Sequence, residues 1–190
     1  MAKRGHPLAT QELLNKYEKY KGARVQFLES IKSQKKKPIS LRDPLSVFSE
    51  ELLASIICGN CATNDCQRGW DVEASGKKYE VKYLINHSEK EWKNEHMITR
   101  KYIGTNDEAT HYAIVIFIDI NPRYVFIFDL SFLDSLYDEL GKRHGKNGED
   151  RGIRLSFTRR NYVDMLAARS IGDNRFAKHG VEIIPLQSDL

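Results

Sequence analysis

Two apolar stretches in the middle of the chain place the strongest constraint on its fold. Residues 111–119 and 123–130 are rich in β-branched and aromatic side chains, and the segment Ile120–Pro122 separates them. Short apolar runs divided by turn residues are typical of buried β-strands. We therefore predict two adjacent strands joined by a turn, with Phe126 and Phe128 in the core.

Helical and strand patterns surround these two stretches. We predict helices at residues 10–33, 44–58, 131–140 and 162–169, strands at 70–74, 78–85, 153–157 and 181–186, and irregular or short helical structure at 87–97. A chain of 190 residues holds one well-buried domain. Because helices flank a central run of strands, the order of elements predicts a mixed α/β fold around one sheet.

The N-terminal fifth of the chain is strongly basic. Residues 1–37 contain ten Lys or Arg and three Asp or Glu, a net charge of +7, whereas residues 38–190 carry −3. We predict a basic N-terminal helical segment, residues 1–37, with Tyr17 on its packed face, followed by a core at residues 38–190. Basic side chains favour a phosphate backbone because they release its condensed counterions. A solvated basic helix is the simpler interpretation.

The remaining composition narrows the class of protein. The longest apolar run is too short to cross a membrane, and no apolar stretch follows the basic N-terminus as in a secretion signal. We therefore expect a cytoplasmic protein that does not contact a membrane. The cysteines are Cys58, Cys61 and Cys66, and their odd number argues against a disulfide framework. Their spacing matches no zinc-binding knuckle closely, so free thiols near a helix end are expected.

The segment from Trp70 to Lys82 has the pattern of a β-hairpin that carries charged side chains, with its turn at residues 75–77. Side chains of a strand alternate between its faces, so Glu80 and Lys82 lie on one face, roughly 7 Å apart along the strand. The turn brings Asp71 back beside them. We therefore predict that two carboxylates and an ammonium group converge at one end of the hairpin.

Two neighbouring carboxylates and a lysine have a definite chemical use. Carboxylate oxygens hold a hard cation such as Mg²⁺, which neutralises charge on a phosphoryl group and lowers the pKa of a bound water. A lysine beside the cation orients or deprotonates that water, or stabilises the transition state. Phosphodiester hydrolysis needs this assembly. The alternative is an exposed strand on which Glu80 and Lys82 form only a solvated pair.

Three segments together resemble the PD-(D/E)xK superfamily of nucleases, in particular its restriction endonucleases. They are Ser49–Gly59, Gly69–Asp71 and Tyr79–Lys82. The resemblance covers residues 45–85 closely and the strands at 112–130 loosely. It implies a single restriction-endonuclease-like domain with a central mixed β-sheet flanked by helices. Trp70 stands where the motif has proline, and Glu73, on the strand face of Asp71, is a weaker candidate ligand.

The resemblance also implies roles for individual residues. Asp71 and Glu80 are the implied ligands of Mg²⁺, and Lys82 is the implied catalytic lysine. A glutamate on the first core helix adds a ligand or a water contact in such families. The spacing favours Glu50 for this position, and Glu51 remains open because the two are neighbours.

The activity and partners follow from the same resemblance. It implies a Type II restriction endonuclease of a restriction–modification system, which hydrolyses double-stranded DNA and leaves 5′-phosphate and 3′-hydroxyl ends. Such a short chain acts either as a homodimer or as the small nuclease subunit of a heterodimeric Type IIS enzyme, whose large subunit recognises the site and cuts the other strand. Two alternatives stay open: a non-catalytic DNA-binding or assembly subunit, and a nuclease of the superfamily that acts on branched or transposon DNA.

Other residues have weaker signals. Arg159, Arg160 and the basic side chains of the glycine-rich loop at 141–152 are candidates for phosphate contacts, with solvated surface an equal interpretation. His111 begins a strand, and we expect it to be packed or exposed rather than catalytic. Tyr162 is expected in the core, and Thr158 is a candidate cap for the helix at 162–169. Phe132 is expected on the inward face of the helix at 131–140.

Overall fold

The computed structural model describes residues 11–19, 22, 44–61, 69–92, 95–100, 109–119, 121–140 and 153–186. Four of the sequence predictions therefore lie outside the described residues. These are the boundary at residue 37, most of the second half of the helix at 10–33, the state of Cys66 and the basic loop at 141–152.

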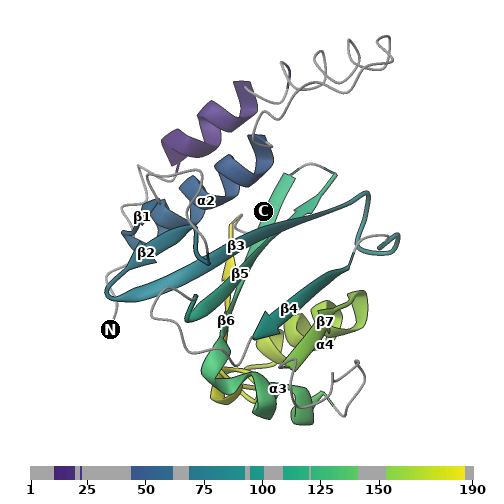
Figure 1. Ribbon diagram of the computed structural model, residues 1–190. Coiled ribbons are helices and arrows are strands. Elements are labelled where there is room, and N and C mark those ends of the chain that lie inside the picture. Colours follow the sequence, from purple (N-terminus) through teal and green to yellow (C-terminus); the bar gives the residue numbers. More distant parts are fainter. Residues whose placement is uncertain are drawn as a thin grey trace, which may run out of the picture.

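A six-stranded mixed sheet forms the centre of the described structure (Figure 1). Its strands, in spatial order, are β1 (Asn60–Cys61), β2 (Val72–Ala74), β3 (Lys77–Asn86), β5 (His111–Ile118), β6 (Asn121–Asp129) and β8 (Val181–Pro185). Strands β3 and β5 are parallel, whereas the other neighbouring pairs are antiparallel. A second sheet pairs β4 (His96–Arg100) with β7 (Ile153–Phe157). The predicted mixed α/β architecture is confirmed, although the described strands form two sheets rather than the one predicted.

The two apolar stretches form β5 and β6, which pair in antiparallel register. Their side chains are largely buried, including Phe126 and Phe128, as the sequence predicts. The turn between them is shorter than predicted, since Asn121 and Pro122 already belong to β6. Asp119 adopts a left-handed conformation (φ 47°), and its carbonyl accepts the Asn121 side-chain amide at 3.2 Å. These features reverse the chain within few residues.

One face of the sheet is covered by helices from the N-terminal part of the chain. Helix α2 (Pro44–Ile57) packs along β2 and β3 (Figure 1). Residues 11–19 form a further helix, whose Tyr17 is buried and stacks on Phe48 of α2 with ring centroids 3.9 Å apart. Both rings approach Phe117 of β5, at 6.0 and 6.1 Å. The N-terminal helix therefore shares this core, and the packed position of Tyr17 is confirmed.

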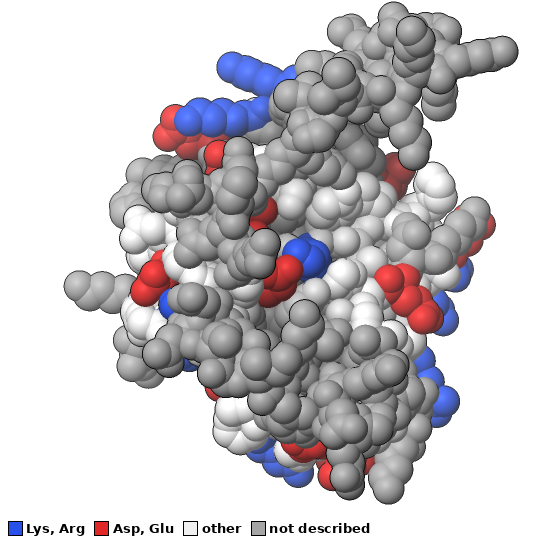
Figure 2. Space-filling model, viewed as in Figure 1, with Lys and Arg blue, Asp and Glu red and all other residues white. Residues whose placement is uncertain are grey.

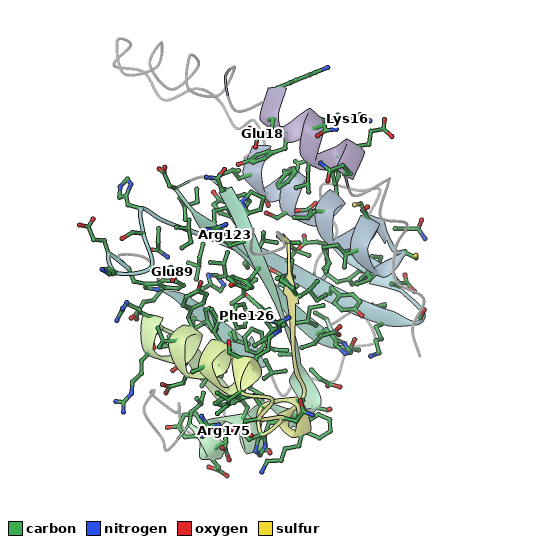
Figure 3. All side chains as sticks on the ribbon, turned by 180° about the vertical axis from the view of Figure 1, so that it is seen from behind. Lys16, Glu18, Glu89, Arg123, Phe126 and Arg175 are labelled. Atoms are coloured by element: carbon green, nitrogen blue, oxygen red, sulfur yellow. The ribbon has the colours of Figure 1, made fainter. Side chains whose placement is uncertain are left out.

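The opposite face is covered by the small sheet and by helices α3 (Leu133–Glu139) and α4 (Arg159–Ser170). Phe126 lies between β6 and α4, with its ring centroid 5.8 Å from that of Tyr162 (Figure 3). The Thr158 hydroxyl accepts a backbone N–H from the first turn of α4. The predicted helix α4, its cap and the buried Tyr162 are confirmed.

No helix in the described parts of the chain is both long and apolar enough to cross a bilayer.

Helix α2 ends close to the sheet that it covers. Cys58 takes a left-handed conformation (φ 54°), and the Gly59 N–H donates to the Ala54 carbonyl at 2.8 Å, as at a helix C-cap. A Cβ on Gly59 would come within 2.8 Å of the Glu73 carbonyl oxygen. Glycine is therefore needed for the chain to pass this close to β2, and the predicted helix end is confirmed.

One sequence prediction is wrong in part, and another is wrong. The irregular structure predicted at 87–97 is present at residues 87–92 and 95. The last two residues begin strand β4 instead, because they pair with β7 from far along the chain. Phe132 is predicted to point inward, but 43% of it is exposed. A 3₁₀ turn (η1, Leu130–Phe132) precedes α3, and its three-residue period turns Leu130 and Leu133 inward instead.

Candidate active site

A tight hairpin builds the candidate site. Strands β2 and β3 pair in antiparallel register, with Ala74 opposite Lys77. The two turn residues, Ser75 and Gly76, have positive φ angles of 51° and 75°, as two-residue hairpin turns require. The predicted hairpin is confirmed, although Lys77 belongs to β3 rather than to the turn.

Asp71 lies just before β2 and is held by two hydrogen bonds to the backbone of β3. Its N–H donates to the Tyr79 carbonyl at 2.8 Å, and its Oδ2 accepts the Val81 N–H at 2.7 Å. These partners are the residues on either side of Glu80, so Asp71 lies beside Glu80, as predicted. A hydrogen bond from a backbone N–H to a carboxylate is charge-assisted, and it fixes the direction of this side chain.

Glu80 and Lys82 lie on one face of β3, since Tyr79 and Val81 are buried on the other face. The Lys82 ammonium is paired with Glu80 Oε1. The side chains of Glu80 and Lys82 are 25% and 38% exposed, so both reach solvent while they remain anchored. In Figure 2, acidic and basic atoms lie side by side near the middle of the face viewed. The predicted convergence of carboxylate and ammonium groups is present.

The structure distinguishes the two acids of helix α2. Glu50 is 3% exposed, and its Oε1 accepts the Ser46 hydroxyl at 3.2 Å. Glu51 is exposed. Of these two neighbours, only Glu50 therefore points into the protein, on the helix that packs against β2 and β3.

The acids of the site form a pair rather than a larger group. Among the described residues, no three His, Cys, Asp or Glu side chains are grouped as ligands of one metal ion. The structure thus brings Asp71 to Glu80 but does not add Glu50 as a third ligand, and Glu73 on β2 is exposed. Mg²⁺ commonly takes one or two carboxylates and keeps several waters, so a pair of acids suits the predicted ion.

Two residues without a sequence signal border this site. Tyr112 of β5 is the register partner of Glu80, and its hydroxyl lies 2.6 Å from His96 Nε2. His96 is the first residue of β4, and its ring centroid lies 5.6 Å from that of Tyr112. The two are separated by 16 residues, and only the packing of the small sheet on the large one brings them together.

The charges of the site act on both of these side chains. Burial, followed by the negative charges of Glu80 and Asp71, raises the pKa of Tyr112. Burial, followed by the positive charge of Lys82, lowers the pKa of His96. A phenol with a raised pKa and an imidazole with a lowered pKa are both neutral at pH 7. The site therefore combines carboxylates and an ammonium group with a neutral hydrogen-bonded pair.

A cavity of about 490 Å³ lies elsewhere on the sheet and is lined by neither carboxylate of the candidate site. His111 lines it and is buried, with Nδ1 2.8 Å from the Thr110 hydroxyl and Nε2 3.7 Å from Asp129. Burial lowers the pKa of His111, although the charge of Asp129 acts in the opposite direction. His111 is a packed side chain, as expected, and does not belong to the candidate site.

The other proposed contacts with nucleic acid stay predictions. Arg159 and Arg160 are exposed at the start of α4, and Arg159 Nε donates to the Glu89 carbonyl at 2.6 Å. The basic residues of the loop at 141–152 lie outside the described residues. Neither Cys58 nor Cys61, the cysteines among the described residues, forms a disulfide.

The residues brought together on this face are therefore Asp71, Glu80 and Lys82, with His96 and Tyr112 beside them. Their chemistry is that of carboxylate, ammonium, imidazole and phenol groups. Comparison with known proteins gives no further guide, because no protein-family model matches the chain and no curated protein is significantly similar to it in sequence.

Proposed function

We propose that the chain is a magnesium-dependent DNA endonuclease of the PD-(D/E)xK superfamily with a restriction-endonuclease-like core. One observation carries the proposal: two backbone hydrogen bonds hold Asp71 beside Glu80, while Glu80 is paired with Lys82. This is the set of two acids and a lysine that the sequence resemblance implies. The mixed sheet, with α2 packed on the hairpin, supplies a rigid frame for the set.

The residues of the site fit Mg²⁺. Carboxylate oxygens are hard donors, and Mg²⁺ is commonly bound by one or two carboxylates together with waters and substrate phosphates. Asp71 and Glu80 would hold the ion, and we propose Glu50 as a further contact from helix α2, through water. When bound, the ion neutralises charge that develops on the phosphoryl group and lowers the pKa of water.

The protein's own groups orient the reaction. A water oxygen attacks phosphorus and loses a proton, the bond from phosphorus to the 3′ oxygen breaks, and the leaving 3′ oxygen takes up a proton from solvent. The products carry 5′-phosphate and 3′-hydroxyl ends. Lys82 orients the water and stabilises the charge on the phosphoryl oxygens, because its ammonium lies against Glu80 at a partly exposed position. The hydrogen bond from Val81 keeps the Asp71 carboxylate in place before the substrate binds.

The proposed substrate is double-stranded DNA, and the proposed partner is a second protein chain. The resemblance to restriction endonucleases implies one of two assemblies. We therefore propose either a homodimer or the small subunit of a heterodimer with a large recognition subunit. Sedimentation of the purified chain distinguishes the two. Efficient cleavage of both strands at one short site by the purified chain alone would reject the heterodimer.

The test of the proposed function is cleavage of plasmid DNA in Mg²⁺, with protein in excess over DNA. We expect the rate of Lys82→Ala to fall by about 10²–10⁴-fold, the range for loss of an acid–base or charge-stabilising group. Lys90→Ala removes the same charge from an exposed position after β3 and should cleave as fast as the unchanged protein. Cleavage by K82A as fast as by the unchanged protein would overturn the proposal, and no cleavage by either protein would favour a non-catalytic DNA-binding subunit.

A further inference from the structure

The hydrogen bond between His96 and Tyr112 links the small sheet to the candidate active site. Tyr112 lies next to Glu80 on the neighbouring strand, and His96 begins β4. His96 Nε2 and the Tyr112 hydroxyl oxygen are 2.6 Å apart. Tyr112 is buried, whereas His96 is half-buried. The imidazole therefore stands at the boundary between the interior and the solvent, beside the carboxylates.

The direction of this hydrogen bond depends on the tautomer of the imidazole. The Tyr112 hydroxyl has one hydrogen to donate, and His96 Nε2 is its hydrogen-bond partner among the described residues. When Tyr112 donates to Nε2, that nitrogen is the unprotonated acceptor and the imidazole hydrogen is on Nδ1. No described residue accepts a hydrogen bond from Nδ1. His96 thus offers an N–H donor that the described part of the fold does not use.

We propose that His96 donates a hydrogen bond from Nδ1 to a phosphate oxygen of the bound DNA strand, and that Tyr112 holds the imidazole in the orientation and tautomer that this contact needs. The inference rests on the nuclease function proposed above. His96 touches the substrate, whereas Tyr112 acts only through His96 and is a positioning residue.

Phosphate is the ligand that suits this donor. The imidazole is close enough to Lys82 for the lysine charge to act on it, so a group that meets both donors must accept hydrogen bonds and tolerate positive charge. A DNA phosphate does both, and half or more of protein–DNA hydrogen bonds go to the phosphate and sugar. A neutral donor adds a hydrogen bond without adding a second positive charge beside Lys82.

Three substitutions of His96 separate this role from a structural one. His96→Ala removes the ring. His96→Asn keeps an N–H donor on an atom attached to Cγ, as Nδ1 is, whereas His96→Gln keeps one at the distance of Nε2. Binding of the full chain to a fluorescent duplex is measured by anisotropy in EDTA. Cleavage is measured in Mg²⁺ with protein in excess, after circular dichroism has shown that each variant is folded.

We expect H96A to weaken DNA binding and to slow cleavage roughly 10- to 100-fold, the range for losing a hydrogen bond to a charged group. H96N should recover most of both quantities, and H96Q should not. Tyr112→Phe keeps the aromatic packing but releases the imidazole, so it should lose less than H96A does. Recovery by Gln rather than by Asn would mean that only the bond to Tyr112 matters, and would overturn the proposal. Unchanged binding and cleavage in H96A would do the same.

The two proposals fail in different ways. If the unchanged protein binds DNA but neither cleaves nor nicks it in Mg²⁺, alone or with a large recognition subunit, the nuclease function fails. The affinities of the three His96 variants in EDTA then still decide whether the donor is used. If K82A loses cleavage while H96A keeps both binding and cleavage, the nuclease function stands. His96 is then a structural residue.

Discussion

Adjacent rungs of the β3–β5 pair carry similar side chains on opposite faces of the sheet. Tyr79 is the register partner of His111 on one face, and Glu80 is the register partner of Tyr112 on the other. Each rung therefore has a tyrosine near a histidine, with ring centroids 4.9 Å apart for Tyr79 and His111 and 5.6 Å apart for Tyr112 and His96.

The two rungs differ in what surrounds the histidine. Both ring nitrogens of His111 face protein groups, the Thr110 hydroxyl and the Asp129 carboxylate. His96 meets Tyr112 through one nitrogen only, beside charged side chains that reach solvent. Polar groups that satisfy one another stabilise the fold, whereas charged groups held in place but accessible are available to a substrate. The same two strands thus carry a structural cluster and a candidate active site.

The largest expected effect is a loss of DNA cleavage when an acid of the candidate active site is changed, but not when an acid of the structural cluster is changed. Asp71→Asn should slow DNA cleavage in Mg²⁺ by about 10²–10³-fold or more, because it removes the charge of a proposed Mg²⁺ ligand. An amide oxygen can still accept the Val81 N–H, so the fold should be retained. Asp129→Asn makes the same change in the other cluster and should leave the rate unchanged. Comparable losses in the two variants, measured with protein in excess over plasmid, would break the comparison.

A second comparison tests which acid of helix α2 belongs to the candidate active site. Glu50→Gln should slow cleavage by about 10- to 100-fold, the usual loss when a group that supports metal ligands is changed. Its neighbour Glu51 is exposed, and Glu51→Gln should cleave at the rate of the unchanged protein. Rates of both variants under the same conditions decide the matter. A larger loss of cleavage in Glu51→Gln than in Glu50→Gln would show that Glu51, and not Glu50, is the helix acid of the site.

The smallest expected effect is a pH dependence of stability that belongs to the structural cluster. Burial lowers the pKa of His111 in the folded protein, so the unfolded chain, with a histidine pKa of about 6.5, takes up the proton first. The contribution of neutral His111 to stability is complete above about pH 6.5 and is lost as the pH falls through the lower, folded value.

Thermal unfolding of His111→Gln tests this dependence. The melting temperature of the unchanged protein should fall between about pH 7.5 and 5.5, and that of H111Q should fall less. Cleavage at pH 7.5 should be the same for both proteins. Parallel pH profiles of the two melting temperatures would show that His111 does not contribute in this way.

Local patterns were enough to predict the charged hairpin. Ser75 and Gly76 form a turn whose positive φ angles fix the register, and strand alternation then places Glu80 and Lys82 on one face. The cap at Thr158 and the central apolar strands follow in the same way, because their signals lie within a few residues of the structure they specify.

Contacts between distant segments could not be predicted from those patterns. His96 meets Tyr112 only because β4 pairs with β7 and the small sheet packs on the large one. The choice between Glu50 and Glu51 depends on how α2 is rotated against the sheet, which the spacing of neighbours does not encode. Phe132 turns outward because a 3₁₀ turn changes the helical phase.

The dependence of DNA cleavage on Mg²⁺ and on Glu80 tests the central claim most directly. Plasmid DNA is incubated in Mg²⁺ with an excess of the unchanged protein, or of Glu80→Gln, before and after addition of EDTA and then of excess Mg²⁺. We predict that the unchanged protein cleaves, stops in EDTA and resumes when Mg²⁺ is restored, whereas E80Q is at least about 10²-fold slower whenever Mg²⁺ is present. Cleavage that persists in EDTA, or an E80Q protein that cleaves as fast as the unchanged one, would contradict the claim.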